Sequence, residues 1–309
     1  DEANAINESW MFLTFTSDLS PYLTDSAASR FLIGIIPASR YLIDPDSGTN
    51  LTLQAACYHI TQSFNRLSQQ GVMNLRAFVT GFKGDWKGIK QVLNFRLESM
   101  DYACTNLDDS APFWRTLYTD EPWTIAPAYS GLKGYDLRMV MPDILHVWHL
   151  GVGRDLAGSA IVFMIKETDI FQGANQQERL HSATMSLKRF ARSQKLPLKL
   201  HKLSKTKLGW TGKTFPELKS SGYDTYVTLK WVLQLSHVFS DALPNSLCSC
   251  LWTADHVISL LTNGGRYLSE EEQENKEVFG MVFLREYMAL ANLALSQRPK
   301  NESAAVAAD

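Results

Sequence analysis

The sequence lacks the features that most directly identify a membrane, secreted or nucleotide-hydrolysing protein. Its 309 residues hold no run near the roughly 18 consecutive apolar residues that a membrane-spanning helix needs, and the first residues do not resemble a secretory signal. No GxGxxG, GxxxxGK[ST], HExxH or G-x-S-x-G motif is present, so dinucleotide-binding, P-loop, zincin and α/β-hydrolase functions have no motif support. We therefore expect no membrane contact.

Cysteine is also scarce, with four residues in the whole chain. The one close pair, Cys248 and Cys250, has a single residue between its members, which suits neither a common zinc hairpin nor a structural disulfide. We interpret these two, with Cys57 and Cys104, as reduced and mostly buried thiols. Reduced thiols favour an intracellular protein.

The residues that are present are typical of a folded globular protein, and the length suggests about two domains or one domain with a large insertion. Hydrophobic residues make up 45%, aromatic residues 11% and charged residues 20% of the sequence. This composition excludes a disordered or fibrous chain. The formal net charge is only −2, but its distribution along the chain is uneven.

Residues 188–219, the basic segment, carry ten basic residues and a single acid, Glu217, which is a net charge of +9 and leaves −11 for the rest of the chain. Such density favours contact with a polyanion, because each neutralised phosphate releases counterions. A solvated lysine-rich connection is the alternative. The nearby Phe190, Trp210 and Phe215 could stack bases or anchor the segment to a core. The candidate nucleic-acid-binding residues are Lys188, Arg189, Arg192, Lys195, Lys199, Lys202, Lys205, Lys207 and Lys213.

The first third of the chain alternates between strand and helix patterns. Apolar runs predict strands at 10–16, 31–36 and 75–82, and helical spacing predicts a helix over 51–70 and another opened by Trp86. The fold class expected for residues 9–100 is therefore α/β or α+β, with a mixed sheet.

The remainder reads as mostly helical after an irregular segment at 101–141, with a disordered tail at 298–309. Pro142 is expected to open the helical region of residues 142–297, because proline is common in a first turn. Further helices are predicted over 175–194, 223–241, 250–263 and 269–297.

Asp85 is the most notable single carboxylate, because it follows a predicted strand and precedes a predicted helix. Carboxylates at strand ends hold Mg²⁺ well, although a helix N-cap explains the same position. Asp143, His146 and His149 follow one another at three-residue spacing, so neighbours in this set could share a helix face as a metal site or a phosphate contact. Hydrogen-bonded core histidines are the alternative.

Glu277 and Glu286 lie on the last predicted helix, and each has an apolar residue four positions later. Either carboxylate could therefore point inward, where it would need a partner such as a metal ion. Surface exposure is the alternative for both.

Six stretches in the same order resemble a transposase-like protein family abundant in dinoflagellate genomes, itself similar to D-D-E transposases of CACTA and KDZ type elements. The resemblance spans about residues 9–298. Its motifs are Ser9-Trp10, the IIPAS of 35–39, the KGDW of 83–86, the DILHVWHLGVGRD of 143–155, the KLGWTGKTFPELKSSGYD of 207–224 and the NGGRYLSEEEQ of 263–273.

This resemblance implies a ribonuclease H-like core with a helical insertion, and DNA cleavage and strand transfer with Mg²⁺ held by three carboxylates. It makes Asp85 the second metal ligand and a late-helix glutamate, Glu277 or Glu286, the third. The first aspartate would precede residue 9, where only Asp1 stands, so we expect a fragment that is inactive in cleavage. A functional protein of this kind would bind DNA in the nucleus. A non-catalytic nucleic-acid-binding or scaffold protein, and a degenerate element product, are the alternatives.

Overall fold

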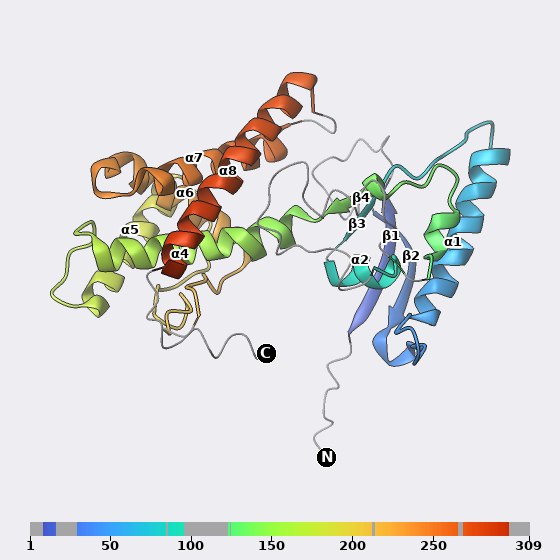
Figure 1. Ribbon diagram of the computed structural model, residues 1–309, viewed down its shortest axis with the longest axis horizontal. Coiled ribbons are helices and arrows are strands. Elements are labelled where there is room, and N and C mark those ends of the chain that lie inside the picture. The colour runs from blue at the N-terminus through green and yellow to red at the C-terminus, as the bar shows by residue number, and fades with distance from the viewer. Residues whose placement is uncertain are drawn as a thin grey trace, which may run out of the picture. The chain divides into compact units, whose positions relative to one another are not determined.

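The computed structural model describes residues 9–16, 30–84, 86–95, 123, 125–211, 214–264 and 268–296 (Figure 1). The chain divides into two compact units, of which the first ends at Asp143 and the second begins at Ile144. The first unit holds the strands, whereas the second is helical. The expectation of a mixed α and β protein is confirmed at this level.

The strands of the first unit form two small sheets. β1 (Trp10–Thr16) pairs antiparallel with β2 (Arg30–Pro37), with an irregularity between Leu13 and Thr14. β3 (Phe82–Gly84) pairs parallel with β4 (Val140–Pro142). Each sheet has two strands within the described residues. These residues therefore show a mixed α and β class but no larger central sheet.

Two helices pack on these strands. α1 (Leu51–Gln70) begins where the Asn50 side chain accepts a hydrogen bond from the backbone of Leu53, and it ends at Gly71, whose φ of 71° suits glycine. α2 (Trp86–Val92) follows β3. The Gln54 side chain links α1 to α2 by donating to the Val92 carbonyl at 3.0 Å. The buried core of this unit consists of Cys57, Ile89, Leu93, Phe95, Trp123, Tyr129 and Leu132.

The strand expected over 75–82 is wrong for most of its length, because only Phe82 and the next two residues pair. The chain instead reverses direction between Val72 and Leu75, whose backbones exchange hydrogen bonds at 2.8 and 2.9 Å. Leu75 and Phe78 remain 73% and 58% exposed. Leu75 and Phe78 therefore lack the burial that would hold this part of the chain in a sheet. Composition alone does not reveal whether such side chains will be buried.

The helix expected to open at Pro142 is also wrong, because Pro142 is the last residue of β4. The chain then forms a π-helix, η4 (Leu145–Val152), with a break at Gly151 (φ −110°, ψ −119°), before α4 (Gly153–Glu167) continues. The prediction of a helix opened by Pro142 assumed one regular helical geometry. The break at Gly151 resets the helical phase.

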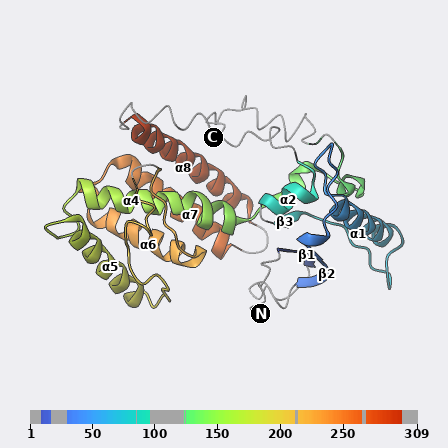
Figure 2. The same ribbon diagram turned by 90° about the horizontal axis from the view of Figure 1, so that it is seen from below.

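The second unit is a group of helices around α4, as both views show (Figures 1 and 2). The other long helices are α5 (Gln176–Ser193), α6 (Gly222–Val238), α7 (Asn245–Asn263) and α8 (Glu270–Ser296), which confirm the four later helices of the sequence analysis. Ile161 and Met164 of α4 are fully buried. Polar side chains also join neighbours: Lys230 of α6 pairs with Asp255 of α7 at 2.7 Å.

The described cysteines form no disulfide with one another. Cys57, Cys248 and Cys250 are free thiols, and burial raises the pKa of Cys57 to about 11.

Among the described residues, α8 is the one helix long and apolar enough to cross a membrane, judged by length and composition. One such helix is weak evidence of a span and is consistent with no membrane contact. The sequence shows no unbroken apolar run in this helix, because Arg285 and Glu286 interrupt it.

Candidate nucleic-acid interface

Buried leucines hold the basic segment against the helical unit. Leu200, Leu203, Leu208 and Leu218 have exposed fractions between 0% and 6%. The residues between these leucines, including the lysines, are mostly exposed. Burying a leucine side chain is worth roughly 1.5–3 kcal/mol. The segment is therefore anchored along its length while its charges remain in water, which differs from a loose solvated connection.

Hydrogen bonds fix the same backbone at three points. The carboxylate of Asp224, buried at the start of α6, accepts from the Lys199 backbone at 2.9 Å. The Thr184 hydroxyl of α5 accepts from the Leu203 backbone at 3.0 Å. The Leu218 backbone donates to the Arg154 carbonyl of α4 at 3.0 Å. Because each bond joins the segment to a different helix, the segment has a defined path over the unit.

A glycine on α4 lets the end of the segment approach closely. A Cβ atom added to Gly158 would lie 2.7 Å from the backbone Cα of Glu217, closer than such contacts occur. Glycine is thus required by space at this position. The missing side chain brings residues 217 and 218 directly onto the buried helix.

The cations of the basic segment are accessible. Seven of the described ones are exposed without an ion pair to a described carboxylate, and Lys188 is half-buried and likewise unpaired. Lys213 lies outside the described residues, and Lys219 pairs with Glu217 at 3.5 Å. The seven exposed residues are Arg189, Arg192, Lys195, Lys199, Lys202, Lys205 and Lys207.

The one acid of the segment does not neutralise these cations. Glu217 also forms an ion pair with Arg154 of α4, which lies outside the segment. Glu217 and Arg154 are both partly buried, with side chains 34% and 27% exposed. The positive charge of the other lysines and arginines is therefore left for solvent or for an anionic ligand.

The aromatic side chains near the segment serve mainly as anchors. Phe190 and Trp210 are half-buried and pack against the core of the second unit. The Lys205 ammonium lies 5.3 Å from the centre of the Trp210 ring, a cation–π distance. Phe215, by contrast, is 42% exposed. Of the two roles open for these aromatics, anchoring fits Phe190 and Trp210.

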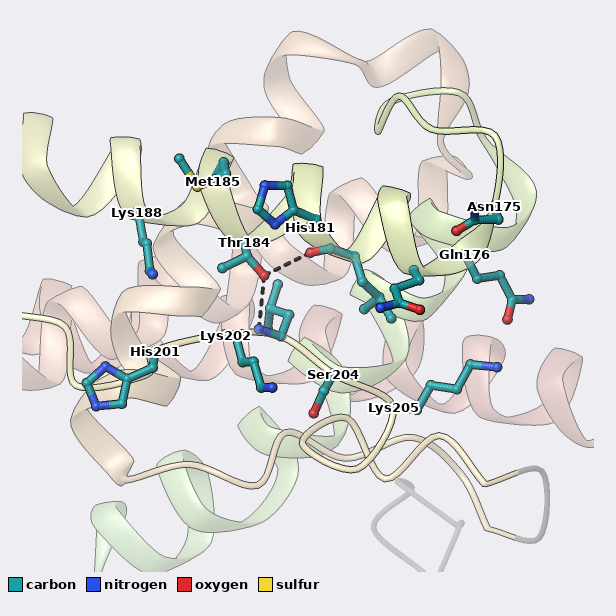
Figure 3. Close-up of a pocket in the computed structure, with 13 residues that line it drawn as sticks. Asn175, Gln176, His181, Thr184, Met185, Lys188, His201, Lys202, Ser204 and Lys205 are labelled. Atoms are coloured by element: carbon teal, nitrogen blue, oxygen red, sulfur yellow. Dashed lines mark hydrogen bonds between the residues drawn. The ribbon is translucent and has the colours of Figure 1, made fainter.

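A cleft of about 850 Å³ lies between α5 and the part of the basic segment that runs past it (Figure 3). Its walls contain three lysines, two histidines and several amide and hydroxyl groups, and no aspartate or glutamate. We call it the cationic cleft. Its lining residues are Asn175, Gln176, Gln177, Leu180, His181, Thr184, Met185, Lys188, His201, Lys202, Leu203, Ser204 and Lys205.

Apart from Lys188, the α5 side of this cleft was not foreseen from the sequence. His181 and the amides at the start of α5 precede the basic segment, so a search for dense charge stops short of them. The sequence feature that could have indicated these residues is the polar face of an amphipathic helix, but most such faces only contact solvent. Only the folded chain brings this face opposite Lys202 and Lys205.

Asp85, the expected metal ligand, lies outside the described residues, but both of its neighbours in the chain are described. Gly84 ends β3, and in the parallel register it pairs with Pro142, the end of β4. The residue after Pro142 is Asp143. Its carboxylate is 20% exposed and lies 4.0 Å from the Lys83 ammonium. An aspartate therefore follows each of two paired parallel strands at their carboxyl ends.

The proposed grouping of Asp143 with His146 and His149 crosses the boundary between the two units, which falls after Asp143. The histidines stand on the π-helix, where backbone bonds join residues five apart, so three-residue neighbours do not share a face as they would on an α-helix. His149 is half-buried beside Tyr226, and burial lowers its pKa. No three metal-binding side chains gather within the described residues.

The two glutamates proposed as the third ligand lie on α8 of the second unit. Glu277 is exposed, and Glu286 is half-buried. Burial, with the charge of Glu286 as a smaller cause, raises the pKa of the Cys250 thiol to about 12. The charge of Glu286 therefore acts on Cys250 of α7.

A separate carboxylate of the second unit has a perturbed environment. Burial and the nearby charge of Glu217 raise the pKa of Asp155, while Arg154 opposes them. This group lies beneath the end of the basic segment, where Leu218 meets α4. Sequence inspection did not single it out, because neither residue type nor spacing distinguishes it from an ordinary first-turn acid.

Comparison of the chain with protein-family models, with curated proteins and with solved structures gives no match.

Proposed function

We propose that the second unit binds nucleic acid through the basic segment, residues 188–219. The observation that carries this proposal is the combination of a fixed backbone and unpaired charge: leucines and hydrogen bonds hold the segment, and eight described cations have no described carboxylate partner. A phosphate backbone is the polyanion that this arrangement suits best, because Lys and Arg contacts release its condensed counterions.

The fixed path of the segment strengthens the proposal. A flexible lysine-rich loop must lose conformational entropy when it binds, at a cost of about 1–2 kcal/mol for each backbone residue that becomes ordered. Here the fold has already ordered the segment by burying Leu200, Leu203 and Leu208. Its cations therefore stand ready for phosphates, and only their side chains need to be immobilised.

Fluorescence anisotropy of labelled duplex DNA at several salt concentrations tests this function. If six cations contact phosphates, the logarithm of the binding constant should fall against the logarithm of salt concentration with a slope of about −5. Binding should change little with DNA sequence, because phosphate contacts carry no base information. Absence of binding at low salt, or a flat salt response, would rule the proposal out.

A second function is favoured by the aspartates that follow β3 and β4. We propose that the first unit is a ribonuclease H-like core whose strand ends bind Mg²⁺ for cleavage of DNA phosphodiesters. Its supports are the order of strands and helices and the pairing of Gly84 with Pro142, which puts Asp85 and Asp143 in corresponding chain positions. Paired carboxylates at such an edge are suited to hold a divalent ion.

Mn²⁺ binding measured by electron paramagnetic resonance tests this second proposal without requiring cleavage. Asp85→Asn and Asp143→Asn should each weaken Mn²⁺ binding, whereas Asp136→Asn, at a half-buried aspartate of the same unit paired with Arg138, should not. A nicking assay on labelled DNA with Mg²⁺ or Mn²⁺ then asks whether the ion supports chemistry. If all three variants bound Mn²⁺ as tightly as the parent chain does, the proposal would be wrong, and a helix cap would remain as the explanation of Asp85.

A further inference from the structure

We infer that the cationic cleft is a binding site for single-stranded nucleic acid, which a duplex cannot enter. This inference rests on the proposed function of the basic segment and adds the form of the ligand. One wall of the cleft is α5 and the other is formed by residues 201–205, and both walls carry cations (Figure 3). A ligand inside it would thus meet positive charge on two sides.

The size of the cleft limits what can occupy it. At about 850 Å³ it lies within the range of ligand pockets, roughly 300–1,000 Å³, and has room for a few nucleotides. A DNA duplex presents its phosphates on a convex surface, and its major groove alone is about 12 Å wide. Such a duplex can lie across the exposed lysines of the segment but cannot enter a concavity of this size. A single strand can follow the cleft, because its backbone is flexible.

The lining supplies a partner for each part of a nucleotide. Lys188, Lys202 and Lys205 are positioned for phosphates. The exposed imidazoles of His181 and His201, one on each wall, offer flat faces for stacking, a role that histidine shares with Phe, Tyr and Trp in single-strand recognition. The side-chain amides of Gln176 and Gln177 can donate to and accept from base edges.

The cleft is also held in shape by its own hydrogen bonds. The Thr184 hydroxyl donates to the Leu180 carbonyl at 2.8 Å and accepts from the Leu203 backbone at 3.0 Å, as the dashed lines in Figure 3 show. The second bond links α5 to the opposite wall at the base of the cleft. Leu180 and Leu203 are buried beneath it, at 6% and 4% exposure. The two walls therefore keep a defined spacing before any ligand arrives.

The acid-free lining points to an anionic ligand rather than a protein partner. Surfaces that dock peptides need apolar pockets, and the cleft offers Met185 as its one well-exposed apolar side chain. Glu178, the nearest acid in sequence, is engaged by the Asn175 amide at 2.8 Å and the Ala174 backbone at 2.8 Å at the start of α5. Its charge is thus directed at the helix start rather than at the lysines.

Anisotropy with matched ligands tests the inference on the full chain. A short labelled oligonucleotide of mixed sequence is offered as single-stranded DNA, as single-stranded RNA and as a DNA duplex. The single strands should bind more tightly than the duplex, and the ratio of DNA to RNA affinity tells which sugar the site prefers. An unlabelled nucleoside triphosphate serves as competitor; if it displaced the strand at equal affinity, the site would be for a free nucleotide and the inference would fall.

Variants at the two histidines separate stacking from charge. His181→Ala and His201→Ala should each weaken single-strand binding at least about fivefold, from the lower end of measured base-stacking contributions. His181→Phe retains a ring and should restore most of that loss. His237→Ala, which removes an exposed histidine of α6 outside the cleft, should have no effect on single-strand binding.

The outcomes distinguish this inference from the proposed function. Equal binding of duplex and single strand, with no effect of His181→Ala or His201→Ala, would overturn the single-strand site while salt-dependent binding to the basic segment persisted. Loss of all binding at low salt would instead overturn the proposed function itself. Both histidines are exposed, so circular dichroism of these variants should match that of the parent chain.

Discussion

The most direct test of the basic segment is to remove charge from it without disturbing its anchors. Lys199, Lys202 and Lys207 are exposed, and each lies next to a buried leucine in the chain. Replacing all three with glutamine retains most of the side-chain length and a hydrogen-bond donor while it removes three positive charges. Because the leucines remain, the change in the free energy of unfolding should stay within about 0.5 kcal/mol per site, as is usual for surface positions.

The expected loss of affinity follows from counterion release. Each phosphate contact contributes about 0.9 to the slope of log affinity against log salt on duplex DNA, so three lost contacts should reduce the slope by about 2.7. At about 0.1 M salt each contact corresponds to a factor of about 8, and three together to a factor of about 500. Loss of only one contact sets the lower limit, a slope change of about 0.9.

A charge-matched control makes the result specific. Lys87, Lys133 and Lys166 are exposed lysines outside the segment, and their replacement by glutamine lowers the net charge by the same amount. Fluorescence anisotropy over a salt series compares the two triple variants with the parent chain. If both variants lost affinity equally, binding would depend on overall charge and not on the segment, and the reasoning from its fixed structure would fail.

Three further predictions concern the support beneath the segment. Leu208→Ala should destabilise the protein by about 2–5 kcal/mol in urea unfolding, because Leu208 is fully buried; a midpoint that does not move would show that the segment is not anchored there. Gly158→Ala should cost about 1–3 kcal/mol, since its Cβ would meet Glu217. Gly280→Ala on α8 should not destabilise, because an added Cβ there would meet no atom within 4 Å apart from its chain neighbours and its own helix backbone. Asp155→Asn should raise the melting temperature at neutral pH. The raised pKa of Asp155 means that its charged form opposes folding, so this gain should shrink as the pH falls and the parent carboxyl protonates; a constant gain would contradict that cause.

The local pattern of the sequence was sufficient for most helices. The spacing of apolar residues and the start at Ser269, whose hydroxyl accepts from the Glu272 backbone at 3.2 Å, predicted α8 closely. These signals are local, because a helix satisfies its hydrogen bonds within one stretch of chain. Local pattern did not suffice for the strand predicted over 75–82, which is wrong at residues 75–81, because a strand needs a partner from elsewhere in the chain.

The same distinction between local and long-range interactions applies to the candidate site. The sequence alone determined the charge of residues 188–219 and the chemical types that could bind phosphate or metal. It could not determine that the leucines of this segment would be buried, that Glu217 would pair with Arg154, or that His181 would lie across a cleft from Lys202. Those facts depend on contacts between residues far apart in the chain, which tertiary packing alone creates. Charge is a property of composition, whereas a cleft exists only after distant segments pack together.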